Sequence, residues 1–154
     1  LMVPIENVAE EIARVLKPGG IFSSVMVNPR ARQKFWGEAQ GFMFNFIDTR
    51  FPKVKEASMG NSRVYTDEGL NTFFSKELGF SKDIEGDNFE LQIEGTPDNV
   101  WNLTKDMYLV GMLSEDIKQE LEQGLKAFVA KHPLVSKGQS FGYPMRKITL
   151  KKHK

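Results

Sequence analysis

The sequence contains no cysteine, so it forms neither a disulfide nor a thiolate metal site, and it offers no cysteine nucleophile. Its two histidines, His132 and His153, have no carboxylate at the spacing of metal ligands, which argues against a metal site. No apolar run reaches the length of a membrane span, and no signal peptide opens the chain. We therefore expect a cytoplasmic protein that does not bind a membrane.

The sequence also lacks an excess of charge of either sign. Its 154 residues include 21 Lys plus Arg and 20 Asp plus Glu, so no overall field attracts the chain to nucleic acid. The hydrophobic content of 40% is ordinary for a soluble domain with a buried core. Phenylalanine is abundant, with 12 residues, which indicates an aromatic-rich core or an apolar substrate chamber.

A helix, a turn and a strand follow one another at the start of the chain. Apolar residues recur three and four positions apart over 5–16, which is the spacing of an amphipathic helix. Pro18 cannot continue that helix, and Gly19 or Gly20 can adopt the left-handed conformation that ends it. The apolar run over 21–27 predicts a strand buried on both faces, as in a parallel sheet with helices on each side.

The sequence Arg14-Val15-Leu16-Lys17-Pro18-Gly19-Gly20, followed by a β run, resembles a late motif of class I S-adenosylmethionine-dependent methyltransferases. In that family the turn joins a crossover helix to the fifth strand of a seven-stranded sheet. Downstream, the run from Val64 to Phe80 resembles the family pattern of Tyr-Thr, helix and Gly-Phe before the sixth strand. The competing explanation is that any helix-to-strand connection can use Pro-Gly-Gly.

The segments that bind the cofactor in this family are missing from the sequence. They are a glycine-rich loop after the first strand and an acidic residue at the end of the second, and both precede the Lys-Pro-Gly-Gly turn. No Gly-x-Gly-x-x-Gly sequence occurs in this chain. The resemblance therefore implies the C-terminal half of a methyltransferase whose cofactor, S-adenosylmethionine, binds mainly to an absent N-terminal half. We assign no residue here a catalytic or cofactor-binding role, although the composition does not exclude a Ser-His-Asp triad.

The remaining elements are predicted from periodicity and helix caps. Alternation predicts a strand over 83–94, most secure from Phe89 to Glu94, and a closing strand from Phe141 to Leu150. In the family the closing strand is antiparallel and lies between the fifth and sixth strands. We expect helices over 32–47, from Thr66 to Gly79-Phe80, from Thr96 to about Met112, and from Ser114 to about Lys131, with a loop over 51–60.

The expected fold class is α/β: the C-terminal part of a Rossmann-like methyltransferase sheet, with flanking helices and a helical insertion before the last strand. The insertion covers about 96–132, where many small-molecule methyltransferases carry helices that help to roof the substrate chamber. Neither an internal repeat nor a linker divides the sequence, so we expect 1–154 to form a single, partial methyltransferase-like domain.

Candidate substrate-binding residues come from two places in the sequence. A turn follows the strand over 21–27, at the end of the strand where ligands bind in open α/β sheets. The aromatic side chains over 32–47 form either a core-facing stripe or a substrate-facing lid. Tyr108 either bonds an acceptor or anchors its helix. The residues placed around a methyl acceptor are Asn28, Arg30, Trp36, Phe42, Phe46, Trp101 and Tyr108.

Two functions are compatible with these features. The first is part of a methyltransferase that acts on a small, partly apolar acceptor and is active only in its complete form. The alternative is a non-catalytic, methyltransferase-like module for binding or assembly. In both, an open sheet edge favours a homodimer or pairing with the missing N-terminal half. The basic residues near the C-terminus are interpreted as a frayed cationic tail rather than an RNA-binding patch: Arg146, Lys147, Lys151, Lys152 and Lys154.

Overall fold

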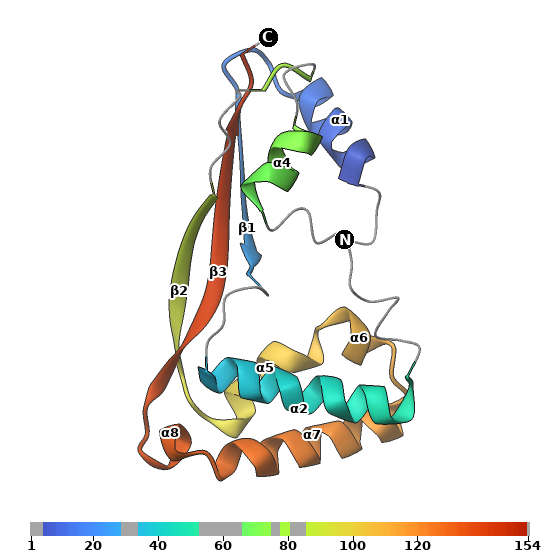
Figure 1. Cartoon of the computed structure of the whole chain (residues 1–154), viewed down its shortest axis with the longest axis vertical. Coiled ribbons are helices and arrows are strands. Elements are labelled where there is room, and N and C mark those ends of the chain that lie inside the picture. Colours follow the sequence, from blue (N-terminus) through green and yellow to red (C-terminus); the bar gives the residue numbers. More distant parts are fainter. Residues whose placement is uncertain (1–4, 29–33, 53–65, 75–77, 81–85, 154) are drawn as a thin grey trace. The chain divides into compact units, whose positions relative to one another are not determined.

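The computed structural model describes residues 5–28, 34–52, 66–74, 78–80 and 86–153. Arg30, the start of the expected helix over 32–47 and most of the expected loop over 51–60 lie outside these ranges. The elements in chain order (Figure 1) are α1 (Ile5–Val15), β1 (Ile21–Val27), α2 (Lys34–Arg50), α4 (Asp67–Phe73), β2 (Gly86–Glu94), α5 (Pro97–Lys105), α6 (Tyr108–Gly111), α7 (Glu115–Ala130), α8 (Pro133–Ser136) and β3 (Ser140–Lys151).

The three strands form one antiparallel sheet in the order β1-β3-β2, so the protein is a mixed α/β chain. β3 pairs antiparallel with β1, with Ile21 opposite Lys151 and Val27 opposite Met145. The closing strand therefore lies between the other two and is antiparallel to β1, as predicted.

The described chain separates into two compact units that each draw on distant parts of the sequence. The first contains 1–31, 59–90 and 144–154, and the second contains 32–58 and 91–143. Both β2 and β3 contribute residues to each unit.

The core of the first unit lies between the sheet and two helices. Figure 1 shows α1 and α4 beside β1 and β3. The buried residues of this core come from α1, α4, the segment after α4 and β3: Ala9, Ala13, Leu70, Phe74, Phe80, Ile148 and Leu150. Phe22 and Met26 of β1 pack against this cluster, so even-numbered positions of the strand face the helices.

The prediction that β1 is buried on both faces is wrong. Ile21 and Val25 are 61% and 53% exposed, and exposure alternates along the strand. Because successive side chains point to opposite faces, burial against α1 and α4 covers only one face. The two described helices of the first unit that pack on the sheet, α1 and α4, contribute to the same core and therefore cover the same face.

The turn between α1 and β1 has the conformation that its glycines suggest. Gly19 has a φ of +81°, a left-handed value that glycine adopts without a steric cost. Gly19 N–H donates to the carbonyl of Lys152, and Lys152 N–H donates to the carbonyl of Gly20. The turn is therefore held against the end of β3.

Of the basic residues interpreted as a frayed tail, Arg146, Lys147 and Lys151 lie in β3 and Lys152 continues its pairing, so that interpretation is wrong for them, while Lys154 lies outside the described residues. β3 continues to Lys151, and Phe80 forms a bridge with Lys152. Lys152 Nζ donates to the carbonyl of Leu16 at 2.8 Å and to that of Ala13. A lysine beside the last carbonyls of a helix satisfies acceptors that have no partner within the helix and complements the helix dipole.

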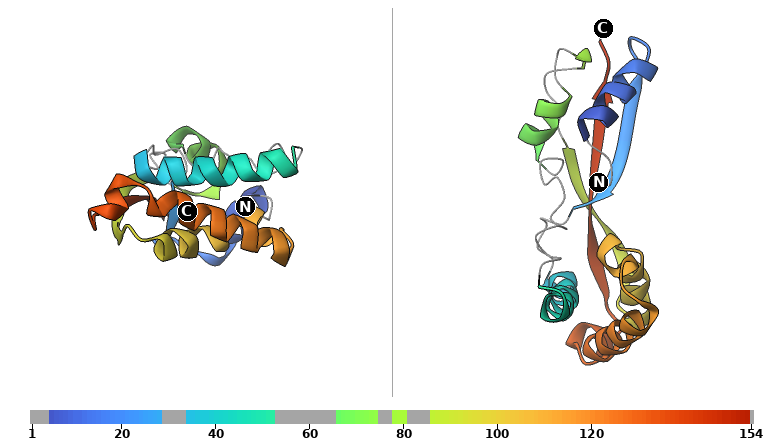
Figure 2. Two further views of the ribbon diagram at one scale, coloured as in Figure 1. Left: turned by 90° about the horizontal axis from the view of Figure 1, so that it is seen from below. Right: turned by 90° about the vertical axis from the view of Figure 1, so that its right-hand side faces the viewer.

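The second unit is a helical layer with the adjoining ends of β2 and β3. α7 lies between α2 and α5 in the left view of Figure 2 and contacts both. Its buried face consists of Leu121, Leu125 and Val129, spaced four residues apart, as expected for the predicted amphipathic helix.

The expected helix from Thr96 to Met112 is two helices. α5 begins with Thr96 as its cap, as predicted, and has Pro97 in its first turn, but it ends at Lys105. Met107 then has ψ of 139°, an extended conformation that no helix continues through, and α6 starts at Tyr108. The sequence carries no proline or glycine at this break, and the apolar spacing continues through it. Neither signal therefore predicts the break.

Two other boundaries differ from the prediction. α4 ends at Phe73, before the expected Gly79-Phe80, although Gly79 does have a left-handed φ of +85°. After α7, residues 133–136 form the short helix α8, which begins at Pro133. Among the described residues, no helix is both long and apolar enough to cross a membrane.

Candidate functional site

A polar network in the first unit includes one predicted site residue, Asn28. Asn28 follows the last residue of β1 and is buried. Its backbone N–H donates to the carbonyl of Pro144 at 2.9 Å, which continues the contact between β1 and β3. Its side-chain Nδ2 donates to Asn88 Oδ1 at 3.0 Å. The carboxyl end of β1 therefore presents a fixed amide.

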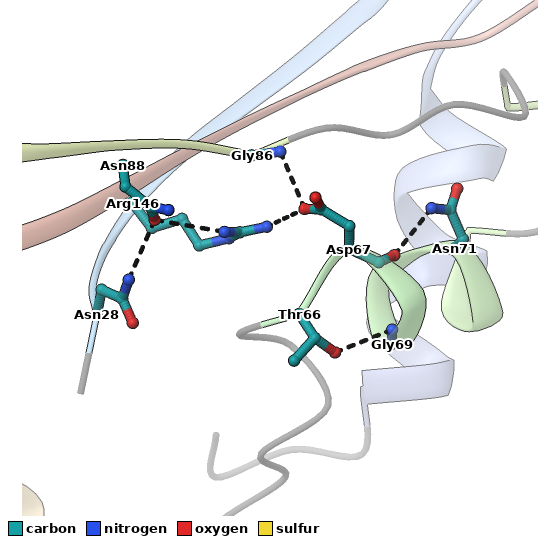
Figure 3. A network of polar contacts seen from close by, with 8 residues as sticks. All are labelled: Asn28, Thr66, Asp67, Gly69, Asn71, Gly86, Asn88 and Arg146. Atoms are coloured by element: carbon teal, nitrogen blue, oxygen red, sulfur yellow. Dashed lines mark hydrogen bonds and ion pairs between the residues drawn. The ribbon is translucent and has the colours of Figure 1, made fainter. Parts of the chain in front are cut away.

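Arg146 is the central residue of this network. It lies on β3 opposite Met26, on the face that packs against α1 and α4, and it is buried. One terminal nitrogen of its guanidinium donates to Asn88 Oδ1 at 3.3 Å, and the other donates to the carboxylate of Asp67. Asn88 Oδ1 thus accepts from both Arg146 and Asn28 (Figure 3).

Asp67 reaches the network from the first turn of α4. Thr66 caps this helix, with its hydroxyl oxygen accepting from Gly69 N–H at 3.1 Å, as predicted from the sequence. Asp67 Oδ1 also accepts from Gly86 N–H at 3.1 Å. Helix, central strand and β2 are therefore joined through one carboxylate. Its negative charge lies at the helix end where the dipole favours an anion.

Gly86 leaves the space that the guanidinium of Arg146 occupies. A β carbon added at this glycine would lie 2.3 Å from Cζ of Arg146. Since real Cβ atoms do not approach other heavy atoms so closely, any larger residue at this position must displace the guanidinium. The glycine is therefore needed for close packing at the start of β2, a known use of glycine in strands.

The two charged groups of the network differ in their exposure to solvent. The side chain of Arg146 is 6% exposed, whereas that of its partner Asp67 is 51% exposed. Nε of Arg146 is buried and has no hydrogen-bond partner. The buried guanidinium of Arg146 therefore fixes the side chains of Asp67 and Asn88. The network contains no nucleophile paired with a general base.

The five predicted aromatic residues lie in the second unit, and four of them pack in or against its hydrophobic clusters. Trp36 is buried with its ring stacked on Phe141, at 6.0 Å between centroids, and edge-on to Tyr143 at 5.1 Å. Burial raises the pKa of the Tyr143 hydroxyl above its ordinary value. Phe42 and Trp101 are half-buried and pack against the same cluster as Trp36. The structure therefore brings Trp36, Phe42 and Trp101 together as part of one apolar core.

Two more predicted residues are more accessible. Phe46 is half-buried beside the neighbouring cluster of Met43 and Ile47, and the guanidinium of Arg50 lies 3.8 Å from its ring centroid. Tyr108, the first residue of α6, is 56% exposed. Asn28 belongs to the first unit and these aromatic residues to the second, while Arg30 lies outside the described residues.

Arg146, Asp67 and Asn88 were missed as site residues. For Arg146 a signal existed in the sequence: it precedes Ile148 and Leu150 by two and four positions, so strand alternation places it on their buried face. Asp67 follows the expected cap Thr66, and an acid in the first turn of a helix is favoured by the helix dipole without any site. For Asn88 no sequence signal distinguished it from other polar strand residues.

His132 has a structural role at the start of α8. Its Nδ1 accepts from Leu134 N–H at 3.1 Å, which caps the short helix, and its Nε2 contacts Glu38 Oε2 at 2.8 Å. Because Nδ1 accepts, the ring proton of the neutral histidine lies on Nε2 and is donated to Glu38. Within the described ranges, no group of three or more acidic, histidine or cysteine residues could hold a metal ion.

A Gly-x-Ser-x-Gly sequence occurs at residues 138–142. In hydrolases with a nucleophile elbow, this pattern lies on a turn from a strand to a helix. Here it leads from α8 into β3, the opposite order, and Ser140 is the first residue of the strand. The pattern therefore carries no hydrolase assignment.

No family model matches the sequence, and a comparison with curated proteins found no match.

Proposed function

We propose that this chain is the substrate-side part of a class I S-adenosylmethionine-dependent methyltransferase that acts on a small, partly apolar acceptor. The observation that carries the proposal is the strand order β1-β3-β2, with β3 antiparallel to β1. The resemblance implies this order for the fifth, seventh and sixth strands of the family. The α1 to β1 connection through Lys-Pro-Gly-Gly, with left-handed Gly19, supports the same interpretation.

The helices between β2 and β3 support an acceptor-side role. α5, α6 and α7 occupy the place in the chain where the family carries a roof over the substrate chamber. Trp101 and Tyr108 on these helices retain exposed surface, whereas Trp36 is buried in the core. We therefore propose that Trp101 and Tyr108 contact the acceptor. Trp36 belongs to the buried cluster against which Trp101 packs, and its proposed role is structural.

The described residues do not fit S-adenosylmethionine, because they include no glycine-rich loop followed by an acidic strand end. Hence no residue of this chain is assigned to the cofactor. Methyl transfer requires an aligned nucleophile and exclusion of water, and the contribution proposed for this chain is to orient and cover the acceptor.

The natural reading frame that contains this sequence provides the first test. The proposal expects a glycine-rich loop after a first strand and an acidic residue at the end of a second, both upstream of residue 1. A reading frame that encodes no such segment would remove the basis of the proposal.

Variants of the complete polypeptide provide the second test. Trp101→Ala is expected to reduce acceptor turnover while the affinity for S-adenosylmethionine changes little, because the residue is assigned to the acceptor. Trp36→Ala is expected to unfold the second unit instead, since loss of a buried tryptophan costs about 3–5 kcal/mol. Lost cofactor affinity with unchanged acceptor turnover in Trp101→Ala would show that the acceptor assignment is wrong.

The edge of the sheet favours the second candidate, a non-catalytic assembly module. Within the described residues, β1 is an edge strand whose seven residues carry no charge. Such an edge readily pairs with another strand. Absence of methyl transfer by the complete polypeptide, together with stable association through β1, would favour this candidate.

A further inference from the structure

His132 connects two segments of the second unit that are far apart in the sequence. Its Nδ1 accepts from Leu134 N–H at 3.1 Å and thereby caps α8. Its Nε2 donates to Glu38 Oε2 of α2 at 2.8 Å, and its ring lies edge-on to Phe35 at 4.8 Å between centroids. Within the described residues, these two hydrogen bonds are the polar contacts of the ring. The side chain is 19% exposed, so it exchanges protons with solvent.

The bond to Leu134 requires a neutral ring. A neutral imidazole has one nitrogen that accepts a hydrogen bond, whereas the protonated ring carries a proton on both nitrogens and has no acceptor. Protonation therefore places an N–H of the ring against the N–H of Leu134. Turning the ring over does not restore the bond, since both nitrogens are then donors. The cap of α8 and a positive charge on His132 exclude each other.

The bond to Glu38 has the opposite dependence on charge. Nε2 carries a proton in both states of the ring, and a charged donor binds a carboxylate more strongly than a neutral donor does. Besides Glu38, the charged residues nearest along these elements are Lys34, one turn earlier on α2, Lys131 after α7 and Lys137 after α8. All three lysines are exposed, so solvent screens their repulsion. A protonated His132 therefore stays bound to α2 while it releases α8.

The helix that this cap holds, α8, has few buried contacts. It comprises only Pro133–Ser136, between α7 and β3 (Figure 1), and none of its residues is buried. Leu134 and Val135 are half-buried and pack against the cluster that contains Trp36 and Phe141. A short segment with few buried contacts opens locally at a lower free energy than the rest of its unit. Loss of the cap is therefore expected to open α8 and uncover this cluster without unfolding α7.

We propose that His132 is a pH-sensitive switch that holds α8 closed when the ring is neutral and releases it when the ring is protonated. The direction follows because cap and charge exclude each other: the closed helix is favoured at higher pH, and the open helix as the pH falls. Histidine is the side chain whose charge ordinarily changes between about pH 5 and 8. All the contacts involved lie within the second unit, so the switch is independent of the proposed methyltransferase role.

Amide hydrogen exchange of the unmodified chain, followed by nuclear magnetic resonance at about pH 7.5 and about pH 5, tests the switch. The quantity compared is the protection of each amide relative to its intrinsic exchange rate at the same pH. Protection of the amides of Leu134 and Ser136 is expected to fall about fivefold at the lower pH, as for the loss of one helix cap. The amide of Leu125, in the middle of α7, should change by less than about twofold.

Two variants separate the contributions of the two histidines. His132→Asn introduces a residue that caps helices but does not titrate, so α8 should stay protected at both pH values. His153→Asn is the matched control, because it removes the other histidine of the chain and should leave the response of α8 to pH unchanged.

Unchanged protection of α8 in the unmodified chain, or an equal fall in His132→Asn, would overturn the proposal. An equal fall at Leu125 would overturn it too, since the whole unit would then be opening. Should His132→Asn fail to fold, the unmodified chain and His153→Asn still decide the question. A loss of protection confined to α8 in both supports the switch, and the absence of that loss in either contradicts it.

Discussion

Arg146 on the central strand forms an ion pair with Asp67 at the start of α4, and only the arginine is withdrawn from water. A buried charge that loses its partner is costly, whereas a half-exposed carboxylate can be hydrated instead. Removing the side chain of Asp67 should therefore change the free energy of unfolding by a different amount from removing that of Arg146.

The inequality gives the first prediction. Asp67→Ala is expected to lower the free energy of unfolding by about 3 kcal/mol, because it leaves the guanidinium of Arg146 buried without its anion. Arg146→Met is expected to cost about 1 kcal/mol, since Asp67 retains solvent and the N–H of Gly86. Urea denaturation followed by far-ultraviolet circular dichroism measures both. A larger loss in Arg146→Met would contradict the burial argument.

The second prediction concerns Gly86. Gly86→Ala is expected to lower the free energy of unfolding by about 1–3 kcal/mol, because the added methyl group meets the guanidinium of Arg146. Gly41→Ala is the control: this exposed glycine lies within α2, and no atom occupies the space of its Cβ. That change should stabilise the protein by about 1 kcal/mol. Equal effects at the two positions would show that the contact with Arg146 is unimportant.

The third prediction concerns Lys152, whose ammonium group donates to carbonyls at the C-terminal end of α1. Lys152→Met removes two hydrogen bonds to the carbonyls of Ala13 and Leu16 and should cost about 1–2 kcal/mol. Lys151→Met removes a charge from an exposed neighbour and should change the stability by less than about 0.5 kcal/mol. The same urea denaturation measures both variants. If Lys152→Met behaves like Lys151→Met, the C-terminus is frayed after all.

A fourth prediction follows from the burial of Tyr143. Burial raises the pKa of this hydroxyl, so the phenolate is disfavoured in the folded state. The stabilisation is therefore complete below the unfolded-state pKa of about 10 and is lost as pH rises above it. Wild type should lose more stability than Tyr143→Phe as the pH is raised from about 8 to about 10.5. Tryptophan fluorescence during urea unfolding reports on this unit, because Trp36 and Trp101 both belong to it. Equal losses would rule out a contribution from Tyr143.

Local signals in the sequence predicted most of the elements. The helix before Pro18, the strand Ile21–Val27 and the caps Thr66 and Thr96 are all confirmed, because each depends on residues close together in the chain. The break at Met107 was not predictable from periodicity, since the apolar spacing continues through it.

The site was harder to predict because its contacts join distant segments. Asp67 and Arg146 are 79 positions apart, and Asn28 and Asn88 are 60 apart. Only strand alternation indicated that the side chain of Arg146 faces the core. Trp36 was recognisable as either core or lid, and only packing against Phe141 and Tyr143 places it in the core.

Calorimetric titration with S-adenosylmethionine tests the proposed function most directly. The titration compares this 154-residue chain with the polypeptide encoded by its complete natural reading frame. The proposal predicts weak or no binding by the chain alone and one-to-one binding by the complete polypeptide, because the main cofactor contacts of the family precede this sequence. Tight one-to-one binding by the chain alone, or no binding by the complete polypeptide, would contradict it.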